Sequence, residues 1–327
     1  MEHHAGFRTL PVSAKAHIDV APRVEYVFVL VRHGERTPLT HCSKLVKTNP
    51  EGYGELTKAG LKQCNNVGKV IRERYPNLLK DQPGEVRATC NKQPVSLQSC
   101  RRILEGLGFK DVIPVEDTTD YDSLETSALM ENYTSVMQER CVGQFQTIGQ
   151  IVDYVVENSG SPTKPEKVVA QSLDSIVTHV HNGHPIPKWA ECHWPEIIWA
   201  DDRLFKMSLV GAKKRIATYA MTRLLETLEQ KFEKKGQLPD KMHLFTTLDI
   251  VVFSFIRLLC STCDQRPPFC SAFFFEVFLE NDEPRVHVMC YTDIAHSSIE
   301  LDNLPNPCTV HALTQELHSI LRKIEER

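Results

Sequence analysis

One segment constrains the fold of this chain more than any other, the run from Val24 to Val31, which reads VEYVFVLV. A nearly continuous stretch of β-branched and apolar residues is typical of a central strand buried on both faces of a parallel sheet. A polar turn, Arg32 to Pro38, follows at once. Because ligands bind beyond the carboxyl ends of such strands, we expect this turn to lie at a functional site.

Helical patterns alternate with the predicted strands. Thr57 opens a helix that stops at Tyr75-Pro76, and a short strand, Glu85 to Thr89, precedes a second helix closed by Gly106 and Gly108. Further strands are predicted over 242–246, 272–280 and 285–291, and further helices over 209–235 and after the capping residue Thr309. This alternation indicates an α/β fold with a mostly parallel central sheet flanked by helices.

The middle of the chain follows a different pattern. From 117 to 200 strand-like runs are scarce and helical stretches are joined by Ser/Gly/Pro loops, which indicates an inserted helical cap. The length of 327 residues suits one core with a sizeable insertion. We therefore predict an α/β core formed by 24–116 and 201–327, a cap over 117–200 and an N-terminal extension over 1–23.

Charge and hydropathy exclude some partners. The net charge is -4, which argues against nucleic acid or anionic membrane as the main partner. The longest apolar run, Ile250 to Cys260, is too short to span a bilayer and contains Arg257. The segment Met1 to Arg23 lacks the apolar stretch of a secretory signal, so a cytoplasmic location is favoured over secretion. The oligomeric state stays open, with a homodimer as one option.

The turn Arg32-His33-Gly34-Glu35-Arg36-Thr37-Pro38 carries the chemistry. Arginine binds phosphate oxygens bidentately and stays charged, so Arg32 and Arg36 can flank one anion. A neutral His33 between them could attack phosphorus if a backbone carbonyl fixes its tautomer. The alternative is a surface loop whose charges pair with each other, and the position directly after a buried strand favours the functional interpretation.

This motif resembles the R-H-G-x-R-x-P signature of the histidine acid phosphatases, a branch of the phosphoglycerate-mutase-like superfamily. Gly54 to Gly60 is similar to the segment that begins the family's first helix, and Val86-Arg87-Ala88-Thr89 resembles its R-S-T segment. His181-Asn182, with the prolines and Trp189 behind them, is similar to a stretch of the family's cap. The resemblance covers roughly residues 24 to 325.

The resemblance implies a metal-free and cofactor-free acid phosphatase acting on small phosphomonoesters. Arg32, Arg36 and Arg87 would bind phosphate, and His33 would form a phosphohistidine intermediate. Asp249 would protonate the leaving alcohol, which predicts an acidic optimum. Gln93 stands where many relatives have a second arginine, and we carry no phosphate role onto it.

Leu248 departs from the family pattern, because relatives have a histidine before the aspartate that Asp249 matches. Losing one positioned donor typically costs on the order of 10²–10³ in rate, which a site with its nucleophile and arginines intact could tolerate. The alternative is a decayed pseudophosphatase that binds phosphorylated ligands. A mutase-like phosphotransferase is a third interpretation, and the R-x-P after R-H-G argues against it. The histidine-rich cap segment 179–193 matches no metal-site spacing known to us.

Overall fold

The computed structural model describes residues 23–45, 52–141, 143–164, 166–233, 239–292 and 295–325, so the predicted N-terminal extension lies almost entirely outside the described residues. One sheet organises the chain, with strand order β3-β2-β4-β1-β5-β6-β7 and β8 paired to β6. The strands are β1 (Val24–Arg32), β2 (Val86–Asn91), β3 (Val115–Asp117), β4 (Met242–Thr247), β5 (Ala272–Glu280), β6 (Glu283–Thr292), β7 (Ala295–Ser298) and β8 (Cys308–Thr309).

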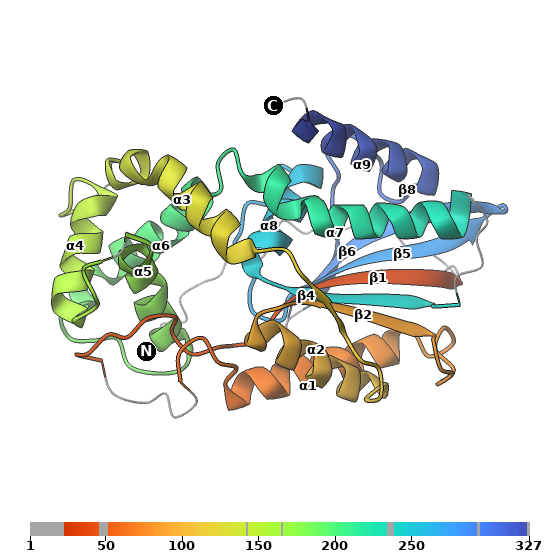
Figure 1. The fold of residues 1–327 in the computed structure, drawn as a ribbon, viewed down its shortest axis with the longest axis horizontal. Coiled ribbons are helices and arrows are strands. Elements are labelled where there is room, and N and C mark those ends of the chain that lie inside the picture. The colour runs from red at the N-terminus through yellow and green to blue at the C-terminus, as the bar shows by residue number, and fades with distance from the viewer. Residues whose placement is uncertain are drawn as a thin grey trace.

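Helices cover both faces of this sheet (Figure 1). On one face lie α1 (Lys58–Arg74) and α2 (Pro94–Leu107), and on the other lie α7 (Lys213–Leu228), α8 (Asp249–Leu259) and α9 (Val310–Glu325). Strands β3, β2, β4 and β1 run parallel, while β5 to β8 pair antiparallel. The predicted α/β class, with a mostly parallel core, is confirmed.

Strand β1 is buried on both faces, as its apolar sequence predicts. Val27, Val29 and Val31 belong to the hydrophobic cluster formed with α1 and α2. Phe28 and Leu30 point the other way, into the cluster formed with α7, α8 and α9. Alternate side chains of one strand therefore join the two halves of the core.

The inserted helices form a layer of their own beside the sheet (Figure 1). They are α3 (Tyr121–Met137), α4 (Ile148–Ser159), α5 (Glu166–His181) and α6 (Trp194–Ser208), the last preceded by the short 3-10 helix Glu191–His193. A third hydrophobic cluster holds them together. Helix α6 continues past residue 200, the boundary that the sequence predicts for the cap, and we keep the name cap for α3 to α6.

Helix α7 and strand β2 differ most clearly from their predicted boundaries. Helix α7 begins at Lys213 rather than Leu209, because the preceding residues form a turn in which Gly211 has a φ of +80°. It passes at Leu228 into a π-helical turn, Glu229–Glu233, and the rest of the predicted helix lies outside the described residues. Strand β2 extends to Asn91, beyond the predicted end at Thr89, which matters for Arg87 below.

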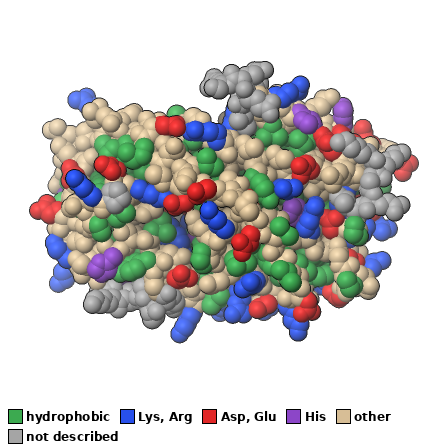
Figure 2. All heavy atoms as spheres, in the orientation of Figure 1, with side chains coloured by type: hydrophobic (Ala, Val, Ile, Leu, Met, Phe, Trp, Pro, Cys, Tyr) green, Lys and Arg blue, Asp and Glu red, His purple; other side chains and the backbone are tan. Residues whose placement is uncertain are grey.

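The surface carries both signs of charge. Figure 2 shows Lys and Arg side chains interspersed with Asp and Glu over the face in view. Within the part of the chain that the structure describes, no helix is both long enough and apolar enough to cross a membrane.

The start of α1 is pressed against the turn that follows β1. Thr57 caps α1 by accepting a hydrogen bond from the backbone N–H of Gly60 at 2.9 Å, as predicted. Gly60 leaves no space for a side chain, since a Cβ there would lie 2.1 Å from the carbonyl oxygen of Glu35. Backbone contact through Gly60 therefore fixes where the turn sits relative to the helix.

We expect Gly60→Ala to destabilise the protein by about 1–3 kcal/mol through overpacking against Glu35. The sign is informative, because glycine to alanine inside an exposed helix normally stabilises it by about 1 kcal/mol. Urea denaturation measures the change, and Asn66→Ala on the exposed side of α1 is the control. A Gly60→Ala protein as stable as the parent would show that the contact can relax.

Candidate active site

The turn after β1 is anchored by the neighbouring strands at the carboxyl edge of the sheet. The backbone N–H of His33 donates to the carbonyl of Thr247 at the end of β4, at 3.0 Å. The carbonyl of His33 accepts from the N–H of Cys270 at 3.1 Å, just before β5. Gly34 has no room for a Cβ, which would lie 2.7 Å from the Cys64 sulfur. The turn is thus held by backbone contacts on both sides.

His33 has the tautomer that the predicted nucleophile needs. Its Nδ1 lies 2.8 Å from the carbonyl oxygen of Gly34, and because a carbonyl only accepts, Nδ1 carries the proton and Nε2 keeps its lone pair. His33 is buried and lines the pocket between core and cap. Burial, together with the charges of Arg32 and Arg36, lowers the pKa of His33 to about 3. The imidazole is therefore neutral even in mildly acidic solution.

Both motif arginines are buried and paired with carboxylates. Arg36 Nη2 donates to the two carboxylate oxygens of Asp174, on α5, at 3.1 and 2.9 Å. Arg32 Nη2 lies 3.0 Å from Asp249, at the start of α8, and its guanidinium stacks over Phe269 with its Cζ 4.0 Å from the ring centroid. The Nε of Arg32 has no hydrogen-bond partner among the described residues, although it is buried.

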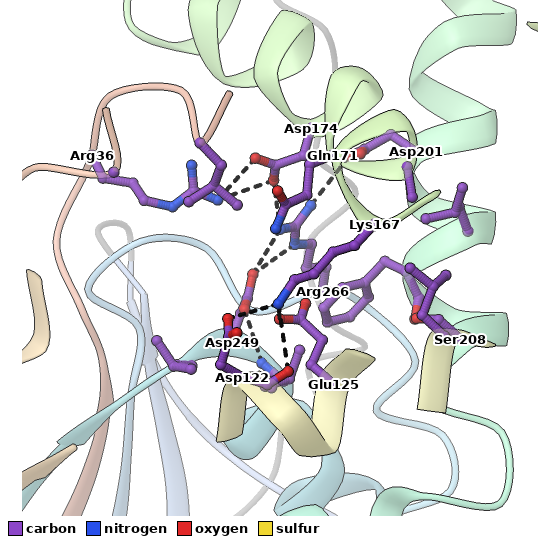
Figure 3. Close-up of a pocket in the computed structure, with 18 of the residues that line it drawn as sticks. Arg36, Asp122, Glu125, Lys167, Gln171, Asp174, Asp201, Ser208, Asp249 and Arg266 are labelled. Atoms are coloured by element: carbon purple, nitrogen blue, oxygen red, sulfur yellow. Dashed lines mark hydrogen bonds and ion pairs between the residues drawn. The ribbon is translucent and has the colours of Figure 1, made fainter. Parts of the chain in front are cut away.

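A third guanidinium, that of Arg266, stands between these carboxylates (Figure 3). It comes from the loop between α8 and β5 and binds Asp249 through Nη2 at 2.7 Å and Asp174, also through Nη2, at 2.8 Å. Its Nη1 lies 3.2 Å from Asp201 on α6. Burial would raise the pKa of Asp249, but Arg32 and Arg266 lower it well below its usual range. Burial raises the pKa of Asp201 to about 7 despite Arg266.

The rim of the pocket adds further charges from the cap. Lys167 on α5 binds Asp122 on α3 at 2.6 Å and lies 4.0 Å from Glu125 (Figure 3). Leu248 and Gln93 also line the pocket and face the site with an apolar and an uncharged side chain. The lining thus mixes basic and acidic groups.

Arg87 does not belong to this site, and its prediction as a phosphate ligand is wrong. Its Cα pairs in register with His243, near the start of β2 and β4, whereas Arg32 pairs with Thr247 at the edge. Four residues of strand separate the two levels, about 13 Å. Arg87 donates to Thr227 at 2.9 Å and lies 3.6 Å from Asp240. Because β2 runs on to Asn91, Arg87 begins the strand rather than ending it.

Three residues of the site were not predicted from the sequence: Asp174, Asp201 and Arg266. Asp174 did leave a signal, because it follows Ala170 by four residues on the buried side of α5. A carboxylate on an apolar helix face needs a partner. Arg266 is followed by two prolines in an irregular loop, and nothing in that pattern indicates where its side chain points.

Several known proteins are similar to this chain in sequence. No family model matches the chain. Testicular acid phosphatase of Mus musculus is 22% identical over 295 residues, which cover 79% of this chain and 68% of the mouse protein. Lysosomal acid phosphatase of Bos taurus is 24% identical over 297 residues, or 80% of this chain and 69% of the bovine protein. Prostatic acid phosphatase of Bos taurus is 36% identical over 64 residues, 19% of this chain and 16% of that protein.

Solved structures agree on the fold. The phytase of Citrobacter braakii superposes with a TM-score of 0.64 at 13% identity, covering 91% of this chain and 98% of the phytase. A multiple inositol polyphosphate phosphatase of Bifidobacterium longum gives 0.64 at 12% identity, covering 93% and 94%. The chain is similar in sequence to acid phosphatases and in fold to phytases, and both similarities support the resemblance to the histidine acid phosphatases. The resemblance inferred from the turn Arg32 to Pro38 is confirmed.

The relatives overturn one expectation drawn from the sequence. Members of the histidine acid phosphatase family that match this chain are named lysosomal and prostatic acid phosphatases, which points away from a cytoplasmic location. The preference for a cytoplasmic protein was therefore wrong. It relied on the residues before the core, whose sequence is a weaker guide to compartment than the relatives of the core itself.

We expect His33 to remain a neutral imidazole, protonated on Nδ1, from pH 8 down to pH 4. The reason is its depressed pKa of about 3, caused first by burial and then by Arg32 and Arg36. Nitrogen NMR of histidine-labelled protein, with His33→Ala to assign the signal, measures both the tautomer and the charge. An imidazolium signal from His33 at pH 5 would contradict the electrostatics described here.

Proposed function

We propose that this chain hydrolyses phosphate monoesters through a phosphohistidine at His33, with Arg32 and Arg36 holding the phosphoryl group. Phosphoric monoester hydrolysis is the activity class that its acid phosphatase relatives support. The observation that carries the proposal is the environment of His33, a neutral imidazole with Nδ1 engaged, set between two arginines at the carboxyl edge of the sheet. No metal or cofactor enters the proposed reaction.

The reaction balances in two steps. The Nε2 lone pair of His33 attacks phosphorus, the phosphorus–oxygen ester bond breaks, and the leaving oxygen takes a proton from Asp249 as the alcohol departs. Water then gives a proton back to Asp249 and attacks the phosphorus, the nitrogen–phosphorus bond breaks, and inorganic phosphate leaves with His33 neutral again. Both guanidinium groups would stabilise the negative charge on the phosphoryl oxygens throughout.

We propose that Asp249 acts as the general acid, and that it can do so only when substrate is bound. In the free protein its ion pairs with Arg32 and Arg266 keep it ionised, so it has no proton to give. A phosphoryl group that takes over Arg32 would weaken one of these pairs and add nearby negative charge. Both effects raise the pKa of Asp249 toward the range where it can protonate the leaving oxygen.

A second function, a protein that binds phosphorylated ligands without turnover, is favoured by two observations. Arg36 Nη2 already donates to both carboxylate oxygens of Asp174, so this arginine is only partly available to stabilise phosphoryl charge during turnover. Leu248 offers no hydrogen bond to the pocket that it lines. Measuring turnover and phosphate binding separately distinguishes this function from hydrolysis.

We expect His33→Ala to abolish hydrolysis of an aryl phosphate between pH 4 and 7, because it removes the proposed nucleophile. Arg36→Gln is expected to lower kcat/KM by about 10²–10³, the usual effect of removing a charge-stabilising donor. Release of the aryl alcohol, followed by absorbance, measures both.

Arg87→Gln is the matched control for Arg36→Gln, since Arg87 lies about 13 Å from the turn along the sheet. Its kcat/KM should stay within threefold of the parent. Equal rates for the parent and His33→Ala would rule out the hydrolase, and retained phosphate binding by both proteins would then establish the second function.

We expect kcat/KM to rise as the pH falls from 8 to 6, in part through Asp201. Because the pKa of Asp201 is about 7, its carboxyl group is mostly ionised at pH 8 and mostly neutral at pH 6. Acidification therefore removes a negative charge that repels the substrate. Asp201→Asn should flatten that part of the profile. The substrate's own ionisation affects both proteins equally, so the difference between their profiles isolates Asp201. Identical profiles would exclude this effect.

A further inference from the structure

Arg266 occupies a position shared by both motif arginines. Its Nη2 lies 2.8 Å from Asp174 and 2.7 Å from Asp249. Asp174 is also the partner of Arg36, and Asp249 is also the partner of Arg32. Guanidinium and carboxylate groups therefore alternate, and Figure 3 shows Arg266 between Asp174 and Asp249.

This arrangement presents an incoming phosphoryl group with an electrostatic problem. A phosphoryl group that binds the Nη2 groups of Arg32 and Arg36 replaces Asp249 and Asp174 as their partners. Both carboxylates are buried, and a buried charge that loses its partner is strongly destabilising. Without another cation, substrate binding would leave two unpaired carboxylates beside a doubly charged anion.

The donors of Arg266 are already directed at carboxylates rather than at open space. Its Nε donates to Asp249 at 2.9 Å, and its Nη1 lies 3.2 Å from Asp201, in addition to the two contacts of Nη2. A guanidinium has five N–H groups, so few remain for a phosphoryl oxygen. The geometry suits a group that retains the two carboxylates while its neighbours exchange partners.

We propose that Arg266 is a positioning residue for a carboxylate-for-phosphate exchange. When a phosphoryl group binds Arg32 and Arg36, Arg266 becomes the remaining partner of Asp174 and Asp249 and keeps both from competing for the motif arginines. This inference deepens the proposed function and rests on the same phosphate site. It concerns binding, so it can be tested without turnover.

The test is calorimetric titration of the whole chain with inorganic phosphate. Arg266→Gln should weaken phosphate binding tenfold or more, because Asp174 and Asp249 then bind only the motif arginines. Asp174→Asn should by itself strengthen binding at least threefold. Added to Arg266→Gln, Asp174→Asn should restore most of the lost affinity, since the competing carboxylate has gone.

This rescue separates positioning from direct contact. If Arg266 itself held the phosphoryl group, removing Asp174 could not replace the lost donor, and the double variant would stay as weak as Arg266→Gln. Arg266→Lys keeps the charge and should fall between the parent and Arg266→Gln. Arg215→Gln removes an exposed arginine of α7 that lies 3.0 Å from Glu131 on α3 and serves as the matched control, with unchanged binding.

Aryl phosphate kinetics give a second measurement. Arg266→Gln should raise KM more than it lowers kcat, as expected for a change in binding. Thermal unfolding in phosphate-free buffer checks that each variant folds. Unchanged phosphate affinity in Arg266→Gln, absence of rescue by Asp174→Asn, or a parent protein that binds no phosphate would each overturn the exchange. A parent that shows the binding pattern without turnover would overturn only the hydrolase.

Discussion

The structure of the site depends on ion pairs that join the core to the cap. Arg36 comes from the turn after β1, while its partner Asp174 comes from α5 in the cap. Arg266 comes from a core loop and reaches both Asp174 and Asp201, on two different cap helices. Because these charges are buried, removing one partner strongly destabilises the other. The cap therefore contacts the core through some of the same groups that are proposed to bind phosphate. Ligand binding would change these ion pairs, so it is coupled to the position of the cap.

Much of the fold could be predicted because its determinants are local. The buried run of β1, the capping residues Thr57 and Thr309, and the alternation of strands with helices all follow from neighbouring residues. Arg87 shows where such reasoning fails. Strand β2 runs two residues further than predicted, to Asn91, which leaves Arg87 near its beginning and away from the carboxyl edge of the sheet. Strand ends depend on pairing with β4 and β3, which the strand's own sequence does not encode.

The candidate site shows the same division between local and distant information. His33 and the two arginines beside it lie in one turn, so a short motif was enough to bring them together. Asp174 is 138 residues from Arg36 and 92 residues from Arg266 along the chain. Their meeting depends on how the cap is placed over the core, and no local pattern specifies that placement. The carboxylates that balance the motif arginines were therefore absent from the predicted site.

This balance changes the meaning of Leu248 and Gln93. Judged by the family resemblance alone, neither supplies the charged or polar group expected at its position, and together they suggest decay. Arg266, however, is a buried guanidinium paired with three carboxylates. Burying such groups costs free energy unless they are well paired, so a pocket without function would not be expected to keep them. A site that had only lost donors would retain an excess of negative charge around His33. Arg266 supplies the compensating positive charge. This favours a pocket that can still bind an anion over a decayed pocket that binds none.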